Sequence, residues 1–149
     1  MERTELPIAV FDSGLGGISV LRALVQRLPG EDFLYFGDSA NAPYGVRPVA
    51  EVRRLTQDVI ARLYDRGIKA AVIACNTATA VCAESLRAEL SMPVVGIEPA
   101  VLPGARTTRT GIIGVMATTK TLASAKYRHL KSIAPKEVRI IDCPCPGLM

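Results

Sequence analysis

Cys75 is the residue whose type and position most favour chemistry in this chain. It follows a short apolar run, residues 70–74, and precedes a segment with a helical pattern. A cysteine at a strand-to-helix turn can be held as a reactive thiolate, because the helix N-terminus stabilises negative charge beside it. Asn76 and Thr77 add polar side chains at the same turn. We therefore expect Cys75 to be a reactive group, the alternative being an inert core thiol.

A second segment suited to ligand binding covers residues 12–17 and reads Asp-Ser-Gly-Leu-Gly-Gly. Glycines let the backbone approach a ligand closely, and the start of the following helix attracts an anion. The spacing does not match a dinucleotide-binding loop, because Ser19 stands where the third glycine would fall. Asp12 would repel a phosphate but suits an ammonium group. The segment therefore favours an amino acid ligand, and a tight structural turn is the alternative.

Two further segments carry side chains that suit ligand binding less specifically. Tyr44 and Gly45 lie in a loop rich in proline, glycine and asparagine, where the tyrosine either offers its hydroxyl or packs half-buried. Thr118 and Thr121 follow a later apolar run. Hydroxyls at a helix start serve as N-caps by default, and binding of a carboxylate is the alternative.

The remaining cysteines and the one histidine indicate no metal site. Cys82 lies two turns into a helical segment among small apolar residues, so we expect it in the core. Cys143 and Cys145 lack the further ligands that zinc requires. His129 stands between basic residues late in a helical pattern, which predicts a surface position. Free thiols and the absence of a secretion signal in this sequence predict a cytoplasmic protein.

Short apolar runs alternate with helical patterns along the whole chain, which predicts an α/β fold. The expected strands cover residues 7–11, 32–36, 69–74, 93–97, 111–116 and 138–141. The expected helices cover residues 16–28, 49–66, 77–90 and 122–133. This alternation predicts a doubly wound, mostly parallel sheet with helices on both faces. Ligands of such folds bind at the carboxyl ends of the strands, where all the segments above fall.

Composition excludes several functional classes. The 149 residues suit one domain, and 49% apolar with 21% charged residues is ordinary for a soluble globular protein. No apolar run approaches the roughly 20 residues of a membrane helix, so we expect no membrane association. The net charge of +4 is scattered and the aromatic content is only 5%. We therefore expect no nucleic acid partner.

Four stretches, in this order, resemble the glutamate racemase family. They are residues 11–17 (Phe-Asp-Ser-Gly-Leu-Gly-Gly), 43–45 (Pro-Tyr-Gly), 74–78 (Ala-Cys-Asn-Thr-Ala) and 117–121 (Ala-Thr-Thr-Lys-Thr). The stretch 34–45 is also typical of that family. Related aspartate and hydantoin racemases share the cysteine turn but not the Asp-Ser-Gly-Leu-Gly-Gly segment at residues 12–17.

The resemblance implies an enzyme that interconverts L- and D-glutamate without a cofactor and supplies D-glutamate for peptidoglycan synthesis. One cysteine, as thiolate, removes the Cα proton, and a second, as thiol, returns a proton to the opposite face. Cys75 corresponds to the first. The positions that correspond to substrate contacts are Asp12, Ser13, Tyr44, Gly45, Asn76 and Thr77. Thr118 and Thr121 are weaker candidates for the same role.

Members of that family are roughly twice as long, as two similar halves, and their second cysteine lies in a Gly-Cys-Thr-His motif of the second half. We expect residues 1–142 to form the first half and residues 143–149 to begin the connection to the second. A fragment of this kind is expected to racemise glutamate poorly and to associate through an apolar face, with a homo-oligomer as one form. The alternative function is a non-catalytic module that binds a carboxylate or an amino acid.

Overall fold

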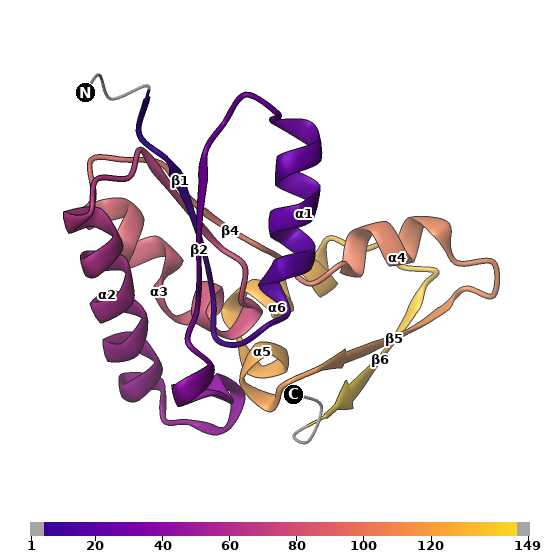
Figure 1. Cartoon of the computed structure of the whole chain (residues 1–149). Coiled ribbons are helices and arrows are strands. Elements are labelled where there is room, and N and C mark those ends of the chain that lie inside the picture. The colour runs from indigo at the N-terminus through magenta and orange to yellow at the C-terminus, as the bar shows by residue number, and fades with distance from the viewer. Residues whose placement is uncertain (1–4, 146–149) are drawn as a thin grey trace. The chain divides into compact units, whose positions relative to one another are not determined.

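The computed structural model describes residues 5–145 of the chain (Figure 1). Its contacts divide the chain into two compact units, Met1–Ile97 and Glu98–Met149. The expected single domain over residues 1–142 stays a prediction. Of the expected connection over residues 143–149, Cys143 and Pro144 instead end a strand that begins at Arg139, and residues 146–149 lie outside the described residues.

The first unit is built on a four-stranded parallel sheet with the strand order β2-β1-β3-β4. The strands are β1 (Ile8–Asp12), β2 (Phe33–Gly37), β3 (Ala70–Ile73) and β4 (Val94–Gly96). The helices are α1 (Gly17–Arg27), η2 (Ser39–Asn41), η3 (Tyr44–Val46), α2 (Val49–Asp65) and α3 (Asn76–Glu89). Every strand and helix expected in this part of the chain is present.

Helices cover both faces of this sheet (Figure 1). Ala9 and Phe11 of β1 are fully buried in one core cluster, which also contains the inward faces of α2 and α3. Val10, the residue between them, belongs to a second cluster in which Leu21 and Leu24 of α1 pack against the opposite face. Side chains alternate across a strand, so the continuous apolar run of β1 serves both layers. The doubly wound α/β prediction is confirmed.

The second unit contains a two-stranded parallel sheet of β5 and β6, in which Ile112 pairs with Arg139. Its elements are α4 (Val101–Thr107), β5 (Ile112–Ala117), α5 (Thr119–Ala123), α6 (Ala125–Ser132) and β6 (Arg139–Pro144). The helices pack on the sheet through a cluster centred on Val101, Tyr127 and Leu130. The strands after β4 therefore form a sheet of their own, and do not extend the four-stranded sheet as the sequence pattern indicated.

Two helical details of the second unit differ from expectation. The helix expected over residues 122–133 is two helices, because Ser124 is extended and its hydroxyl caps α6 by accepting a hydrogen bond from the Tyr127 N–H at 3.1 Å. Helix α4 was not among the expected elements, and it contains Pro103 and Gly104. Pro103 lies in the first turn of α4, where a missing N–H costs no helical hydrogen bond.

Candidate functional site

Cys75 lies between the end of β3 and the start of α3, at the N-cap position of the helix. Its backbone is extended, and its Sγ accepts a hydrogen bond from the Ala78 N–H at 3.4 Å. The side chain is 8% exposed, so the sulfur is held at the helix start and nearly shielded from water. A backbone N–H directed at sulfur stabilises negative charge there, which favours the thiolate role expected from the sequence.

Ser13 faces Cys75 from the loop that follows β1, with 3.3 Å between Ser13 Oγ and Cys75 Sγ. The contact follows from the sheet order, because β1 and β3 are neighbours and their carboxyl ends meet at one edge. Ser13 is itself 7% exposed. The structure therefore brings together two of the predicted site residues that are 62 positions apart in the chain.

Asp12 is the last residue of β1, and its carboxylate contacts the loop that follows this strand. Its Oδ2 accepts a hydrogen bond from the Gly14 N–H at 2.9 Å, and the residue is 6% exposed. A Cβ added at Gly17 would lie 2.6 Å from the Asp12 Cβ and 3.1 Å from the Cβ of Ala74. Gly17 is thus required where the start of α1 packs directly on the strand ends that carry the site.

Tyr44 is fully buried beside this region, and its hydroxyl is already engaged. It donates a hydrogen bond to Asp38 Oδ2 at 2.7 Å. Burial first, and then the hydrogen bond to Asp38, raise the pKa of Tyr44 well above its ordinary value, and negative charge on Cys75 adds to the rise. Tyr44 is therefore a neutral phenol that points at a carboxylate, while its ring packs near that of Phe11.

Asp38 is the residue at this site to which sequence reasoning assigned no role. Its carboxylate is 7% exposed and also accepts from Asn41 Nδ2, at 3.0 Å and 3.1 Å. The Asp38 N–H in turn donates to Asp12 O at 2.9 Å, which ties the loop to the end of β1. A signal was available, because Asp38 directly follows an apolar strand of a parallel sheet, the position where polar side chains gather.

Asn76 and Thr77 open helix α3 next to Cys75. Within residues 5–145, no donor reaches the buried Asn76 Oδ1. A buried acceptor without a partner costs free energy, and an incoming N–H donor would satisfy it. Thr77 is 4% exposed. Gly45, the last of the predicted substrate contacts, lies in η3 together with Tyr44.

Thr118 and Thr121 belong to the second unit, where Thr118 is the N-cap of α5 and Thr121 lies within that helix. Thr118 Oγ1 accepts from the Thr121 N–H at 3.2 Å and lies 3.0 Å from Thr121 Oγ1. The N-cap interpretation is confirmed for the Thr118 hydroxyl.

Cys82 and His129 occupy the positions that the sequence predicted, whereas Cys143 lies in β6 and not in a connecting loop. Cys82 is 1% exposed in the core, where burial raises the pKa of its thiol. His129 is exposed on α6. In the described part of the chain, no three acidic, histidine or cysteine side chains are grouped to hold a metal ion. None of the helices described is long and apolar enough to cross a membrane.

Comparison with known proteins identifies the family to which this chain is similar. A family model described as Asp/Glu/Hydantoin racemase matches residues 8–135. A protein named glutamate racemase from Clostridium acetobutylicum is 49% identical over 144 residues, which cover 96% of this chain and 56% of that protein. A protein of the same name from Ectopseudomonas mendocina is 47% identical over 150 residues, or 100% of this chain and 57% of that protein.

Solved structures show the same fold. The structure of Escherichia coli glutamate racemase in complex with L-glutamate and the activator UDP-MurNAc-Ala has a TM-score of 0.85 and 33% identity, over 93% of this chain and 53% of that one. Glutamate racemase from Aquifex pyrophilus has a TM-score of 0.83 and 35% identity, over 96% and 56%. The chain therefore spans somewhat more than half the length of these relatives.

Proposed function

Because this chain belongs to the Asp/Glu/hydantoin racemase family, we propose that it takes part in the cofactor-independent racemisation of glutamate, with Cys75 as a catalytic base. In this reaction the Cα–H bond of glutamate breaks and the proton passes to Cys75 Sγ. The electron pair stays on Cα and is delocalised into the adjacent carboxylate. Protonation of the opposite face by a second acid then yields the other enantiomer.

The observation that carries this proposal is the surroundings of Cys75 Sγ. The sulfur is nearly buried, accepts the Ala78 N–H at the start of α3 and lies 3.3 Å from Ser13 Oγ. Preorganised donors of this kind stabilise a thiolate before substrate arrives and need no reorganisation during proton transfer. A positioned general base contributes about 10²–10⁴-fold to the rate.

The same edge of the sheet has groups that suit an α-amino acid. The Asn76 Oδ1 acceptor and the Asp12 carboxylate both suit an ammonium group, whose three N–H donors need acceptors once water is excluded. Gly45, Tyr44 and Thr77 stay predicted contacts. The proposed substrate is accordingly glutamate, and the proposed product, D-glutamate, would serve peptidoglycan synthesis in the cytoplasm.

The acid that returns the proton is not assigned to a residue of this chain. In the first unit, the other described cysteine, Cys82, is buried and directed at Arg53 O rather than at Cys75. We therefore propose that Cys75 serves one face of the substrate only. The resemblance places the second cysteine in a Gly-Cys-Thr-His segment of longer relatives, so the chain alone is expected to racemise poorly.

Exchange of the Cα proton tests this proposal directly. The chain is incubated with L- or D-glutamate in D₂O, and loss of the Cα–H signal is followed by NMR. We expect exchange of one enantiomer, abolished in Cys75→Ala and retained in Cys82→Ala, the matched control in the same helix. Exchange that survives in Cys75→Ala would contradict the assignment. Calorimetric binding of glutamate without any exchange would instead favour the alternative of a non-catalytic amino-acid-binding module.

A further inference from the structure

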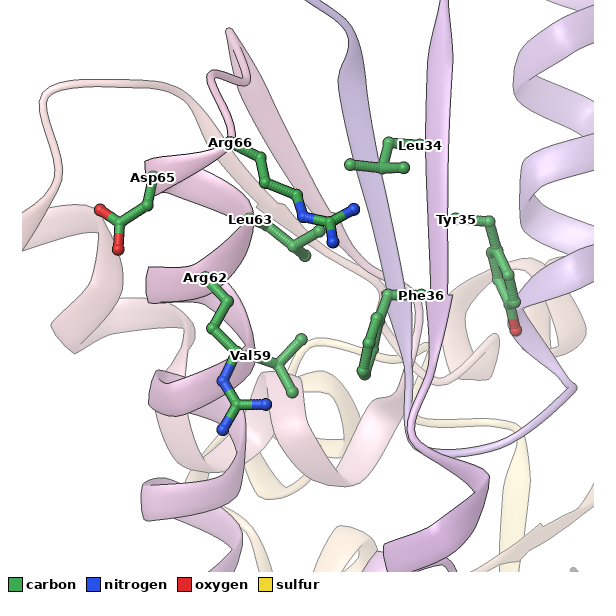
Figure 2. Close-up of a pocket in the computed structure, with 8 residues that line it drawn as sticks. All are labelled: Leu34, Tyr35, Phe36, Val59, Arg62, Leu63, Asp65 and Arg66. Atoms are coloured by element: carbon green, nitrogen blue, oxygen red, sulfur yellow. The ribbon is translucent and has the colours of Figure 1, made fainter.

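A groove separate from the candidate site runs between β2 and α2 of the first unit (Figure 2). Its volume is about 420 Å³. Leu34 and Phe36 of β2 and Val59 and Leu63 of α2 give it an apolar lining. Phe36 is 36% exposed, so the ring lies open to a ligand. None of the residues predicted for glutamate chemistry lines this groove.

Two guanidinium groups flank the apolar lining. Arg62 lies in the last turn of α2, Arg66 follows one turn later as the C-cap of the helix, and both line the groove. Among residues 5–145, neither of them forms an ion pair, whereas Arg54 of the same helix is paired with Asp58 at 3.0 Å. Asp65 also borders the groove, but its carboxylate points away from the two guanidiniums in Figure 2. The groove therefore offers two unpaired positive charges beside exposed apolar surface.

The outer backbone of β2 completes the groove. The sheet order makes β2 an edge strand, and the backbones of its two flanking residues, Asp32 and Asp38, hydrogen-bond toward β1. Since peptide groups of a parallel strand point alternately to either side, the N–H and C=O of Tyr35 point outward. The Tyr35 side chain lies on the other face, with its hydroxyl donating to Gly14 O at 3.0 Å. Tyr35 therefore lines the groove with its backbone.

We propose that this groove binds an extended acidic segment of a partner protein, added as a further strand at the edge of β2. The Tyr35 peptide groups would pair with the backbone of the segment, as in other cases of strand addition. Side chains two residues apart on a strand are about 6.6–6.8 Å apart, and four residues of helix rise about 6.0 Å. Carboxylates at alternate positions of the segment therefore match Arg62 and Arg66.

The positive charge of the groove distinguishes two candidate occupants, a second copy of this chain and an acidic segment. A second copy of this chain, paired edge to edge by a two-fold axis, would bring the Arg62 and Arg66 side chains of both copies together. Like charges in such an arrangement repel, whereas carboxylates are attracted and accept hydrogen bonds from guanidinium groups. The acidic segment is therefore the favoured occupant, and this inference does not depend on the proposed racemase chemistry.

Binding of designed peptides to the full 149-residue chain tests the inference. The probe is a fluorescent, blocked heptapeptide of alternating valine and glutamate, titrated by anisotropy. We expect saturable binding that weakens with added salt, and about fivefold weaker binding to the Arg62→Gln/Arg66→Gln variant. The Arg22→Gln/Arg27→Gln variant removes the same charge from exposed positions of α1 and is expected to bind like the wild type. Circular dichroism verifies that each variant is folded.

Three results would overturn the inference. The first is no binding by the folded wild-type chain up to the solubility limit of the peptide. The second is equal binding of a peptide with glutamine in place of glutamate, or an equal loss in both double variants. The third is unchanged binding when alternate amides of the heptapeptide are N-methylated, whichever of its two strand edges carries the methyl groups. Strand addition requires the N–H groups that methylation removes.

Discussion

Gly37→Ala is the substitution whose effect can be worked out most fully from the structure. Gly37 ends β2, and a Cβ at this position would lie 2.3 Å from the carbonyl oxygen of Gly14. The Tyr35 ring is also close, at 3.3 Å, and its hydroxyl donates to the same oxygen. Gly14 belongs to the loop that holds Ser13 against Cys75. The added methyl group therefore acts on stability and on the site at once.

The size of the effect follows from that distance. Relieving the contact to between 3.0 and 3.4 Å requires the loop or the strand to move by about 0.7–1.1 Å, which is the difference from 2.3 Å. Overpacking of this kind costs about 1–3 kcal/mol. For a chain of this length, 2 kcal/mol lowers Tm by roughly 6 °C. A misplacement of about 1 Å near the reacting groups also predicts an exchange rate lower by up to about 10²-fold.

Urea unfolding, monitored by far-UV circular dichroism, measures the loss of stability. Cα exchange of glutamate in D₂O measures the loss of exchange rate. Gly30→Ala is the matched control, because a Cβ there meets nothing within 4 Å and the backbone has no positive φ. We expect Gly30→Ala to be neutral or to gain about 0.4–1 kcal/mol. A Gly37→Ala chain that is as stable as Gly30→Ala and exchanges the Cα proton normally would refute the close contact at Gly14 O.

Three further predictions follow from single contacts. Tyr44→Phe removes a donor from the buried Asp38 carboxylate and is expected to cost about 1–3 kcal/mol in urea unfolding; an unchanged midpoint would contradict that bond. The hydrogen bond from Tyr127 and the Lys131 ammonium lower the pKa of Asp142, so its contribution is present above the ordinary carboxyl pKa and lost as the pH falls through the lowered one. Asp142→Asn should therefore destabilise the chain by about 1 kcal/mol or less at pH 7, with a smaller difference from wild type at low pH, and a thermal-unfolding difference that grows toward acid would be the wrong sign. Burial raises the pKa of Cys82, so in Cys75→Ala chains this thiol should react with a disulfide reagent only as fast as the protein opens, and rapid labelling in the native state would place it on the surface.

Local sequence pattern was sufficient for the elements that carry the site. The apolar periodicity of residues 49–66 identifies the buried face of α2, including Val52, Ile60 and Leu63. Continuous apolar runs identify β1 and β3, because a strand covered on both faces has no polar side. Cys75 and Ser13 could be selected as chemical groups, since both follow such a run directly. These inferences depend only on neighbours in the chain.

Other features of the fold and the site could not be predicted from the local sequence pattern. Ser124 caps a new helix only because the chain turns there, and nothing in the pattern of residues 122–133 distinguishes a continuous helix from two. The separation of β5 and β6 into their own sheet depends on which strands pair, which is a long-range property. The place of Asp38 at a strand end is a local signal, but its partners Tyr44 and Asn41 are set by how the following loop folds back onto it.

The sequence by itself determined the types of the reactive groups and the turns on which they lie, because strand ends, helix starts and glycine loops are encoded by nearby residues. Only the tertiary structure decided which of these turns meet. Placing β1 between β2 and β3 brings Ser13 to 3.3 Å from Cys75 and leaves β2 at the edge of the sheet. Strand order and register are set by the burial of whole faces against α1, α2 and α3, and no local pattern specifies that packing.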